Sequence, residues 1–271
     1  MSERDLPIGL FDSGVGGLTV LAAMLKRMPN ESYAFLGDTA RLPYGTKSSE
    51  TIIRYSLQTT SKLVELGIKA LVIACNTATS AALPTLRAAY PGLPVIGVVE
   101  PGAAAACAAS RTGRIAVIAT KATVRGGAYE RAIRALRPDA WVQAVACPLF
   151  VPMAEDGLTE GPLAEGMAQR YLGGVFNAGI KPDCLVLGCT HFPLLKKAIR
   201  AVVGDGVAIV DSAETTAGLL EKLLRGNGME TLRSEGTCRF LTTDDPEGFA
   251  DTGSRFLGMR LSAFDVELVD L

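Results

Sequence analysis

The sequence has almost no histidine, no excess of either charge and no long apolar run. It contains one histidine in 271 residues, and its 27 basic and 28 acidic side chains give a formal net charge of -1. Nucleic acids and anionic membranes require a basic surface that this balance does not provide. A membrane-spanning helix needs ~18 consecutive apolar residues, and no stretch approaches that length. We therefore expect a small-molecule partner, and neither nucleic acid nor a membrane.

The N-terminal residues and the cysteines indicate the compartment. The first residues, MSERDLPIGLF, lack the small-residue cleavage site of a secretory signal. The six cysteines are dispersed and form no CxxC pair, so we expect reduced thiols rather than a disulfide framework. Zinc usually needs four clustered ligands, and one histidine with scattered cysteines offers at most a partial set. We therefore expect a cytoplasmic protein that contains no metal.

Short β-branched runs alternate with helical patterns along the whole chain. The runs predict eight strands, at 8–11, 33–36, 71–74, 95–99, 115–119, 142–146, 185–187 and 207–210. Between them lie helical patterns such as 49–67, whose apolar residues recur at steps of four and three before Gly67 closes the last turn. This alternation predicts an α/β fold of doubly wound parallel sheets with helices on both faces.

A short pseudo-repeat favours two similar α/β units over one large sheet. In KALVIACNTAT at 69–79 and in DCLVLGCTHFP at 183–193, an apolar strand ends in a small residue that precedes a cysteine. VVEPG at 98–102 is the expected crossing between the units. We expect the first unit to comprise 1–98 plus about 209–228 and the second to comprise 99–208 plus about 236–271, with a return of the last segment to the first unit as the alternative.

The two repeated cysteines, Cys75 and Cys189, occupy positions typical of an active site. Ligands of open α/β sheets bind outside the carboxyl ends of the strands, where both thiols are expected, each just before a helix. A helix N-terminus lowers the pKa of a nearby thiol and can hold a carboxylate. Asn76, Thr77 and Thr190 add side-chain donors there. Most other cysteines after apolar strands are inert core thiols, and we assign that role to Cys107, Cys147, Cys184 and Cys238.

A third strand–loop–helix turn, DSGVGG at 12–17, follows the strand at 8–11. It lacks the GxGxxG spacing of a dinucleotide loop and the lysine of a P-loop, so nucleotide binding is disfavoured. We interpret Asp12 as a proton relay beside a thiol, with a helix N-cap as the alternative. For Ser13, a capping role and a ligand contact remain equally open.

His191 follows Cys189 by only two residues, so both side chains can face one cleft. An imidazole beside a thiol can stabilise the thiolate or carry its proton, and we favour this role over a structural one. Glu155, in CPLFVPMAEDG, is a further acidic candidate, whereas the adjacent Asp156 fits a solvated loop.

At these residues the sequence resembles the glutamate racemases, cofactor-independent enzymes of the aspartate/glutamate racemase family that supply D-glutamate for bacterial peptidoglycan. The resemblance covers essentially the whole chain and rests on six motifs: GLFDSGVGGLTV at 9–20, GDTARLPYG at 37–45, VIACNTAT at 72–79, ATKATV at 119–124, PLFVPMAEDG at 148–157 and LGCTHFPLL at 187–195. Two departures are small: Ala119 stands where members often carry glycine, and Asp156 where a second glutamate is common.

The resemblance implies a fold, partners and residue roles. It implies two α/β domains of pseudo-twofold symmetry with the active site in the cleft between them, glutamate as substrate, no cofactor and a homodimer. Cys75 and Cys189 are then the two catalytic bases. Asp12 assists Cys75, while His191 and Glu155 assist Cys189. The implied substrate contacts are Asp12, Ser13, Tyr44, Gly45, Asn76, Thr77, Thr120, Thr190 and His191.

Two thiols satisfy the chemistry of racemisation, but other activities remain open. Inverting an α-carbon requires a base on one face and an acid on the other, without need of lysine, cofactor or metal. An aspartate or hydantoin racemase would carry the same two cysteines on the same fold. A thiol hydrolase would use Cys189 and His191 as nucleophile and base, which leaves Cys75 unexplained. A protein that binds carboxylates without catalysis is a further alternative.

Overall fold

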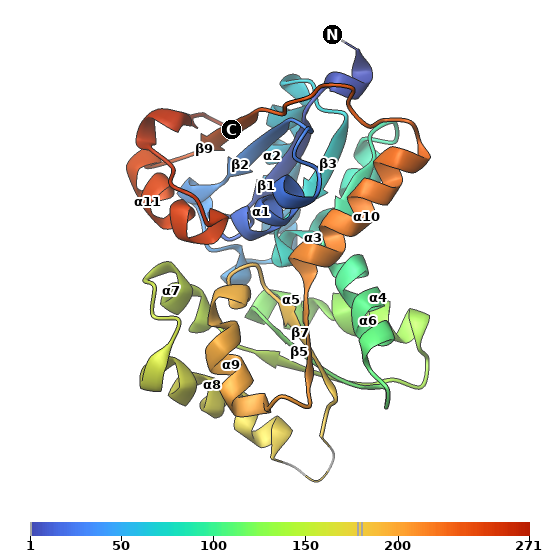
Figure 1. Ribbon diagram of the computed structural model, residues 1–271, viewed down its shortest axis with the longest axis vertical. Helices are drawn as coiled ribbons and strands as arrows, with labels where there is room; N and C mark the ends of the chain where they lie inside the picture. The colour runs from blue at the N-terminus through green and yellow to red at the C-terminus, as the bar shows by residue number, and fades with distance from the viewer. Residues whose placement is uncertain (1, 178, 180) are drawn as a thin grey trace.

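The structure, a computed structural model, describes residues 2–177, 179 and 181–271 and consists of two stacked units, each built on a parallel sheet (Figure 1). All eight predicted strands are present close to their expected bounds, which confirms the α/β fold. Both chain termini lie in the upper unit (Figure 1). Among the described helices, none combines the length and the apolar character needed to cross a bilayer.

The first sheet has six parallel strands in the order β10-β9-β2-β1-β3-β4. Its strands are β1 (Ile8–Asp12), β2 (Tyr33–Gly37), β3 (Ala70–Ile73), β4 (Val95–Gly97), β9 (Cys238–Thr242) and β10 (Val266–Leu268). The helices around it are α1 (Leu18–Arg27), α2 (Ser49–Glu65), α3 (Asn76–Ala89), α10 (Ser212–Gly226) and α11 (Pro246–Leu257). The pattern predicted at 49–67 is thus α2, and Gly67 has the positive φ of 73° that ends such a helix.

The second sheet has four parallel strands in the order β6-β5-β7-β8. Its strands are β5 (Arg114–Ala119), β6 (Trp141–Ala146), β7 (Cys184–Gly188) and β8 (Ala208–Asp211). Its helices are α4 (Val99–Ala109), α5 (Lys121–Gly126), α6 (Ala128–Leu136), α7 (Phe150–Glu155), α8 (Gly161–Phe176) and α9 (Lys196–Val203). The chain enters this unit through α4, at the expected crossing.

The end of the chain returns to the first sheet, which differs from the expected assignment of 236–271 to the second unit. β9 pairs with β2, and β10 pairs with β9. β8 stays in the second sheet, so the return begins at α10 rather than at 209. The physical reason is reach: the 15 residues of α10 span about 22 Å and carry the chain to the far end of the first sheet. A parallel strand can start there beside β2, whose residues are all buried.

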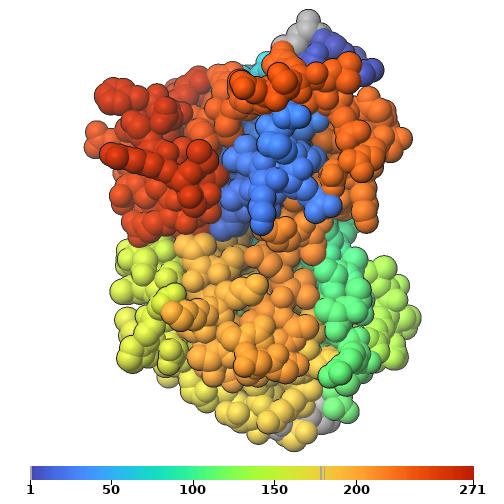
Figure 2. Space-filling model, viewed as in Figure 1, coloured from blue at the N-terminus to red at the C-terminus, as the bar shows by residue number. Residues whose placement is uncertain are grey.

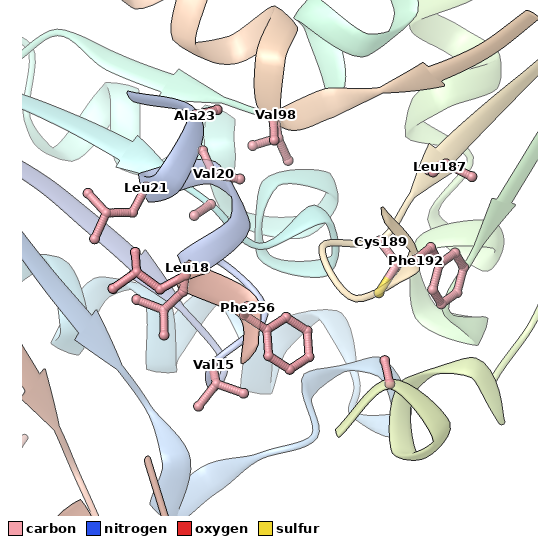
Figure 3. Packing of buried hydrophobic residues seen from close by; sticks show 14 of the residues in the cluster. Val15, Leu18, Val20, Leu21, Ala23, Val98, Leu187, Cys189, Phe192 and Phe256 are labelled. Atoms are coloured by element: carbon pink, nitrogen blue, oxygen red, sulfur yellow. The ribbon is translucent and has the colours of Figure 1, made fainter. Parts of the chain in front are cut away.

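The largest apolar cluster is continuous through both units. It joins the α1, α10 and α11 side of the first sheet to the α7, α8 and α9 side of the second. Figure 3 shows part of it, with Phe256 of α11 between Val15 and the turn that carries Cys189. The space-filling view shows the C-terminal segment, in red, directly above the segment around α7 (Figure 2). This shared core holds the two units against each other at the strand ends.

Candidate active site

The carboxyl ends of four strands, two from each sheet, converge where the units meet. In the first sheet β1 ends at Asp12 and β3 is followed by Cys75; in the second sheet β5 is followed by Thr120 and β7 by Cys189. Side chains that follow such strands collect at one edge of a sheet. Here the two edges border one cavity of about 170 Å³. The site is therefore assembled from both units.

The cavity wall contains every predicted site residue except one. Those that line it are Asp12, Ser13, Tyr44, Gly45, Cys75, Asn76, Thr77, Thr120, Cys189, Thr190 and His191. Glu155, the exception, lies behind His191 and bonds to its far ring nitrogen. Cys107, Cys147, Cys184 and Cys238, assigned to the core, do not line this cavity and are free thiols like the other two.

Cys75 caps the N-terminus of α3 and is held there as a thiol. Its Sγ accepts a hydrogen bond from the Ala78 amide at 3.4 Å and lies 3.7 Å from Ser13 Oγ. Burial and the nearby Asp12 carboxylate raise the pKa of Cys75 well above its usual value, and the hydrogen bonds from Ala78 and Ser13 only partly offset this. The helix N-terminus was expected to lower this pKa. In the free protein, loss of hydration outweighs the helix dipole.

Cys189 belongs to a chain of three polar groups. His191 Nδ1 lies 3.8 Å from Cys189 Sγ, and His191 Nε2 lies 2.9 Å from Glu155 Oε1. Burial lowers the pKa of His191, but Cys189 and Glu155 outweigh it and raise that pKa to about 10. The imidazole is therefore protonated at neutral pH. The helix expected just after Cys189 is instead a short 3-10 turn at Phe192–Leu195 that leads into α9.

Asp12 organises the glycine loop that enters the cavity. Its Oδ2 accepts hydrogen bonds from the Gly17 amide at 2.9 Å and the Gly14 amide at 3.3 Å. A Cβ at Gly16 would collide with Thr190 and His191, so only glycine lets the loop approach the second unit this closely. The N-cap of α1 is Gly17, so Asp12 is not the helix cap of the alternative interpretation; it binds two amides of the loop, while its charge acts on Cys75 and His191.

Hydroxyl and amide groups form a further part of the cavity wall. Thr77 of α3 and Thr120 of the second unit lie 2.9 Å apart through their Oγ1 atoms, and Thr123 completes a triangle of hydroxyls. Asn76 is 2% exposed, and among the described residues its Nδ2 has no hydrogen-bond partner. An unpaired buried donor costs about 1–3 kcal/mol, which an anionic ligand would remove.

The loop that carries Tyr44 and Gly45 closes another side. The Tyr44 hydroxyl donates to the buried Asp38 carboxylate, so it is already committed to a protein partner. A Cβ at Gly45 would lie 2.9 Å from Thr120 Cβ, which shows how closely this loop approaches the second unit. The ring of Tyr44 and the backbone at Gly45 are therefore what this loop presents to a ligand.

The similarity of the chain to known proteins agrees with this arrangement. A family model described as Asp/Glu/Hydantoin racemase matches residues 13–220. A glutamate racemase from Geobacter metallireducens is 50% identical over 265 residues, covering 97% of this chain and 96% of the relative. The chain belongs to the glutamate racemases of this family. It is accordingly an isomerase.

Two solved glutamate racemases share the fold over nearly the whole chain. The structure from Thermus thermophilus, in complex with β-chloro-D-alanine, has a TM-score of 0.89 and 44% identity and covers 100% of this chain and 99% of its own. The structure from Francisella tularensis, in complex with D-glutamate, has a TM-score of 0.91 and 34% identity and covers 98% of both chains. Both are crystal structures of the enzyme class to which this racemase belongs.

Part of the racemase cavity was not predicted. Pro43, Pro148, Val151 and Pro152 form an apolar section of the wall, and Thr46 and Lys121 complete it. The proline-bounded motifs at 37–45 and 148–157 contain most of these residues. The three prolines and Val151 carry no reactive group, so only packing across the two units shows that they shape the site, whereas Lys121 lies within the motif at 119–124.

Proposed function

We propose that Cys75 and Cys189 interconvert L- and D-glutamate by a two-base transfer of the α-proton. The observation that carries the proposal is that one thiol from each unit lines the same cavity. A thiolate on one face of the substrate removes the α-proton, and a thiol on the other face delivers a different proton. The two groups exchange roles when the reaction runs in reverse, and the overall proton count is unchanged.

The residues that assist proton transfer are divided between the two cysteines. Glu155 and His191 keep a protonated imidazole beside Cys189 Sγ, which balances negative charge on that sulfur and can return a proton to it. Asp12 serves the Cys75 side, where its carboxylate favours the protonated thiol. The enzyme thus starts with unlike environments around the two sulfurs, which suits a reaction that needs one base and one acid at a time.

The substrate carboxylates are held by the donors of the wall. Ser13, Asn76, Thr77, Thr120 and Thr190 line the cavity with hydroxyl and amide groups. Donors aimed at charge that develops on the α-carboxylate contribute several kcal/mol to carbanion stability in a site that excludes water. Removal of the α-proton at neutral pH depends on this stabilisation as much as on the thiolate.

The proposed activity also supports a location in the cytoplasm. D-glutamate made by this reaction is used in peptidoglycan synthesis, so the enzyme works in the cytoplasm where those precursors form. We further propose a homodimer, as the family resemblance implies. Sedimentation equilibrium checks the assembly directly, because the chain has a mass of 28.4 kDa and a single-species mass near that value would contradict a dimer.

Racemisation in heavy water tests the two-base mechanism. L-glutamate is incubated with enzyme, and both enantiomers are analysed by mass spectrometry at low conversion. The D-glutamate product is expected to carry deuterium at the α-carbon, while the remaining L-glutamate keeps its original proton. Deuterium entering the substrate pool as fast as product forms would instead point to a single base.

The other activities are separated by direct assays. Circular dichroism with L-glutamate and L-aspartate in parallel measures substrate preference, and we expect loss of rotation with glutamate. A thiol hydrolase would accumulate a covalent adduct on Cys189 during turnover, which intact-mass spectrometry detects. A protein that only binds carboxylates would bind glutamate without exchanging its α-proton.

A further inference from the structure

The Asn76 side chain is fixed by a tyrosine from the other unit. Asn76 stands at the start of α3 in the first unit, and its Oδ1 accepts a hydrogen bond of 2.7 Å from the hydroxyl of Tyr129 in α6. The oxygen and the nitrogen of the Asn76 amide therefore differ in their hydrogen bonding. Oδ1 is bound to Tyr129, while Nδ2 has no partner among the described residues.

Tyr129 lies in a slot bordered by two glycines. A Cβ at Gly102 of α4 would lie 3.2 Å from the tyrosine oxygen, and a Cβ at Gly188, next to Cys189, would lie 3.0 Å from ring atom Cε2. Tyr129 is 1% exposed. A larger residue at either glycine would push the ring from its place. The ring therefore packs beneath the Cys189 turn while its hydroxyl reaches the residue after Cys75.

The Tyr129 hydroxyl keeps its proton and can donate a hydrogen bond. Burial raises the pKa of Tyr129 well above its usual value, although Ser212 at the start of α10 acts in the opposite direction. The nearby Asp211 carboxylate adds to the increase. The neutral phenol donates to Asn76 Oδ1, which leaves Nδ2 as the end of the amide with no partner among the described residues.

We propose that Tyr129 is a positioning residue for the racemase reaction: by holding Asn76 Oδ1, it directs Nδ2 into the cavity as a donor to a carboxylate of glutamate. The proposal rests on the proposed function, since it assumes that glutamate occupies the cavity. Three features support it, namely the buried hydrogen bond, the unpaired Nδ2 and the slot that the two glycines leave for the ring. Tyr129 itself does not line the cavity.

The test is a double-mutant cycle between Tyr129 and Asn76, read out by substrate affinity. Tyr129→Phe keeps the ring in its slot and removes only the hydroxyl. We expect KM for both enantiomers, and the calorimetric Kd for D-glutamate, to rise roughly 3- to 10-fold. In an Asn76→Ala background the same change is expected to alter KM less than about twofold, because the amide to be oriented is absent.

Tyr33→Phe is the matched control for loss of a buried hydroxyl. Tyr33 is also 1% exposed, and its hydroxyl donates to the Met24 and Met28 carbonyls, none of these three residues being part of the cavity wall. This variant is expected to lower the melting temperature without changing KM. If Tyr129→Phe is poorly folded, Gly102→Ala displaces the tyrosine oxygen while keeping the hydroxyl, and a smaller rise in KM is expected.

Each outcome supports or overturns the proposal. A rise in KM that disappears in the Asn76→Ala background supports it. An unchanged KM in Tyr129→Phe, or an equal rise in both backgrounds, overturns it while leaving an active wild type and therefore the proposed function intact. A wild type that does not racemise glutamate overturns both.

Discussion

His191 bridges Glu155 and Cys189: its Nε2 lies 2.9 Å from Glu155 Oε1, and its Nδ1 faces Cys189 Sγ at 3.8 Å. The ring of Phe256 packs edge-on against the imidazole with centroids 5.0 Å apart. The imidazole is consequently held on three sides, by a carboxylate, a thiol and an aromatic ring. Its orientation is set before any substrate arrives, so its effect on Cys189 can be measured in the free enzyme.

His191→Asn is expected to raise the pH at which iodoacetamide alkylates Cys189, because the variant removes a positive charge beside the sulfur. A neighbouring charge shifts a pKa by about 1–3 units. The measurement is alkylation of each cysteine by peptide mass spectrometry across pH. Cys75 serves as the internal control and should keep its profile nearly unchanged. A variant that shifts Cys75 and spares Cys189 would show that the helpers are paired with the wrong sulfurs.

The raised pKa of His191 also predicts how stability depends on pH. Its folded value of about 10 exceeds the reference value of 6.5, so the folded state binds this proton more tightly than the unfolded state. The resulting stabilisation is complete below about pH 6.5 and is lost as pH rises toward about 10. Urea unfolding of the wild type and of His191→Asn at several pH values measures it. The difference between the two proteins should shrink across this window, and a difference that grows would reverse the assignment.

Asp12→Asn is expected to lower the pH at which Cys75 is alkylated. The substitution removes a buried negative charge that raises the pKa of Cys75, while the new amide oxygen can still accept from the Gly17 amide. Because the enantiomers have equal energy, kcat/KM must fall equally in both directions. Alkylation profiles and kinetics in both directions check these points. A Cys75 profile that moves to higher pH would contradict the electrostatic argument.

Lys69→Ala is expected to destabilise the fold by about 3–5 kcal/mol, because it leaves the buried Glu31 carboxylate unpaired. Lys69 Nζ bonds to Glu31 Oε2 at 2.5 Å and to the Arg4 and Met229 carbonyls, and both charged side chains are almost fully buried. Glu31 in turn accepts from the Thr231 amide. Chemical denaturation measures the loss.

The ion pair of Arg87 and Glu100 provides the control for that measurement. Its side chains are about half exposed, and such pairs contribute at most about 1 kcal/mol. Arg87→Gln should therefore leave the free energy of unfolding nearly unchanged. Equal losses in the two variants would mean that burial of Lys69 and Glu31 does not decide the outcome.

The sequence was sufficient to predict the strands that are continuous apolar runs and to identify the site residues that follow them. β1, β3, β5 and β7 are such runs, and the polar residues at their ends proved to share one cavity. β9 and β10 were missed. β9 begins with the partly exposed Cys238 and Arg239, and β10 is the three-residue VEL with two exposed positions. Neither presents the period of a core strand: β10 is short and forms the edge of the sheet, and in β9, which lies between β10 and β2, only the last three residues are buried.

Contacts between the two units could not be predicted from the sequence either. The bond between Tyr129 and Asn76, and the proline section of the wall, join residues that are distant in sequence, and neither Tyr129 nor the prolines carry a group that marks them as part of the site. The expected assignment of 236–271 to the second unit was wrong for the same reason. The sequence pattern does not show that α10 leads the chain back to the first sheet, where β9 pairs with β2. Local chemistry could be predicted because it depends on neighbours in sequence, whereas these features depend on how two sheets meet.

The late pairing of β9 with β2 has a consequence for synthesis on the ribosome. β1 to β4 emerge first, but the outer edge of β2 has no partner until residues 238–242 have left the exit tunnel. The four-stranded sheet of the second unit is complete well before that point. The nascent chain therefore carries an open, apolar strand edge for most of its translation, and such an edge invites wrong pairing with other chains. Expression at lower temperature, or with a chaperone that shields such edges, should improve the yield of folded enzyme.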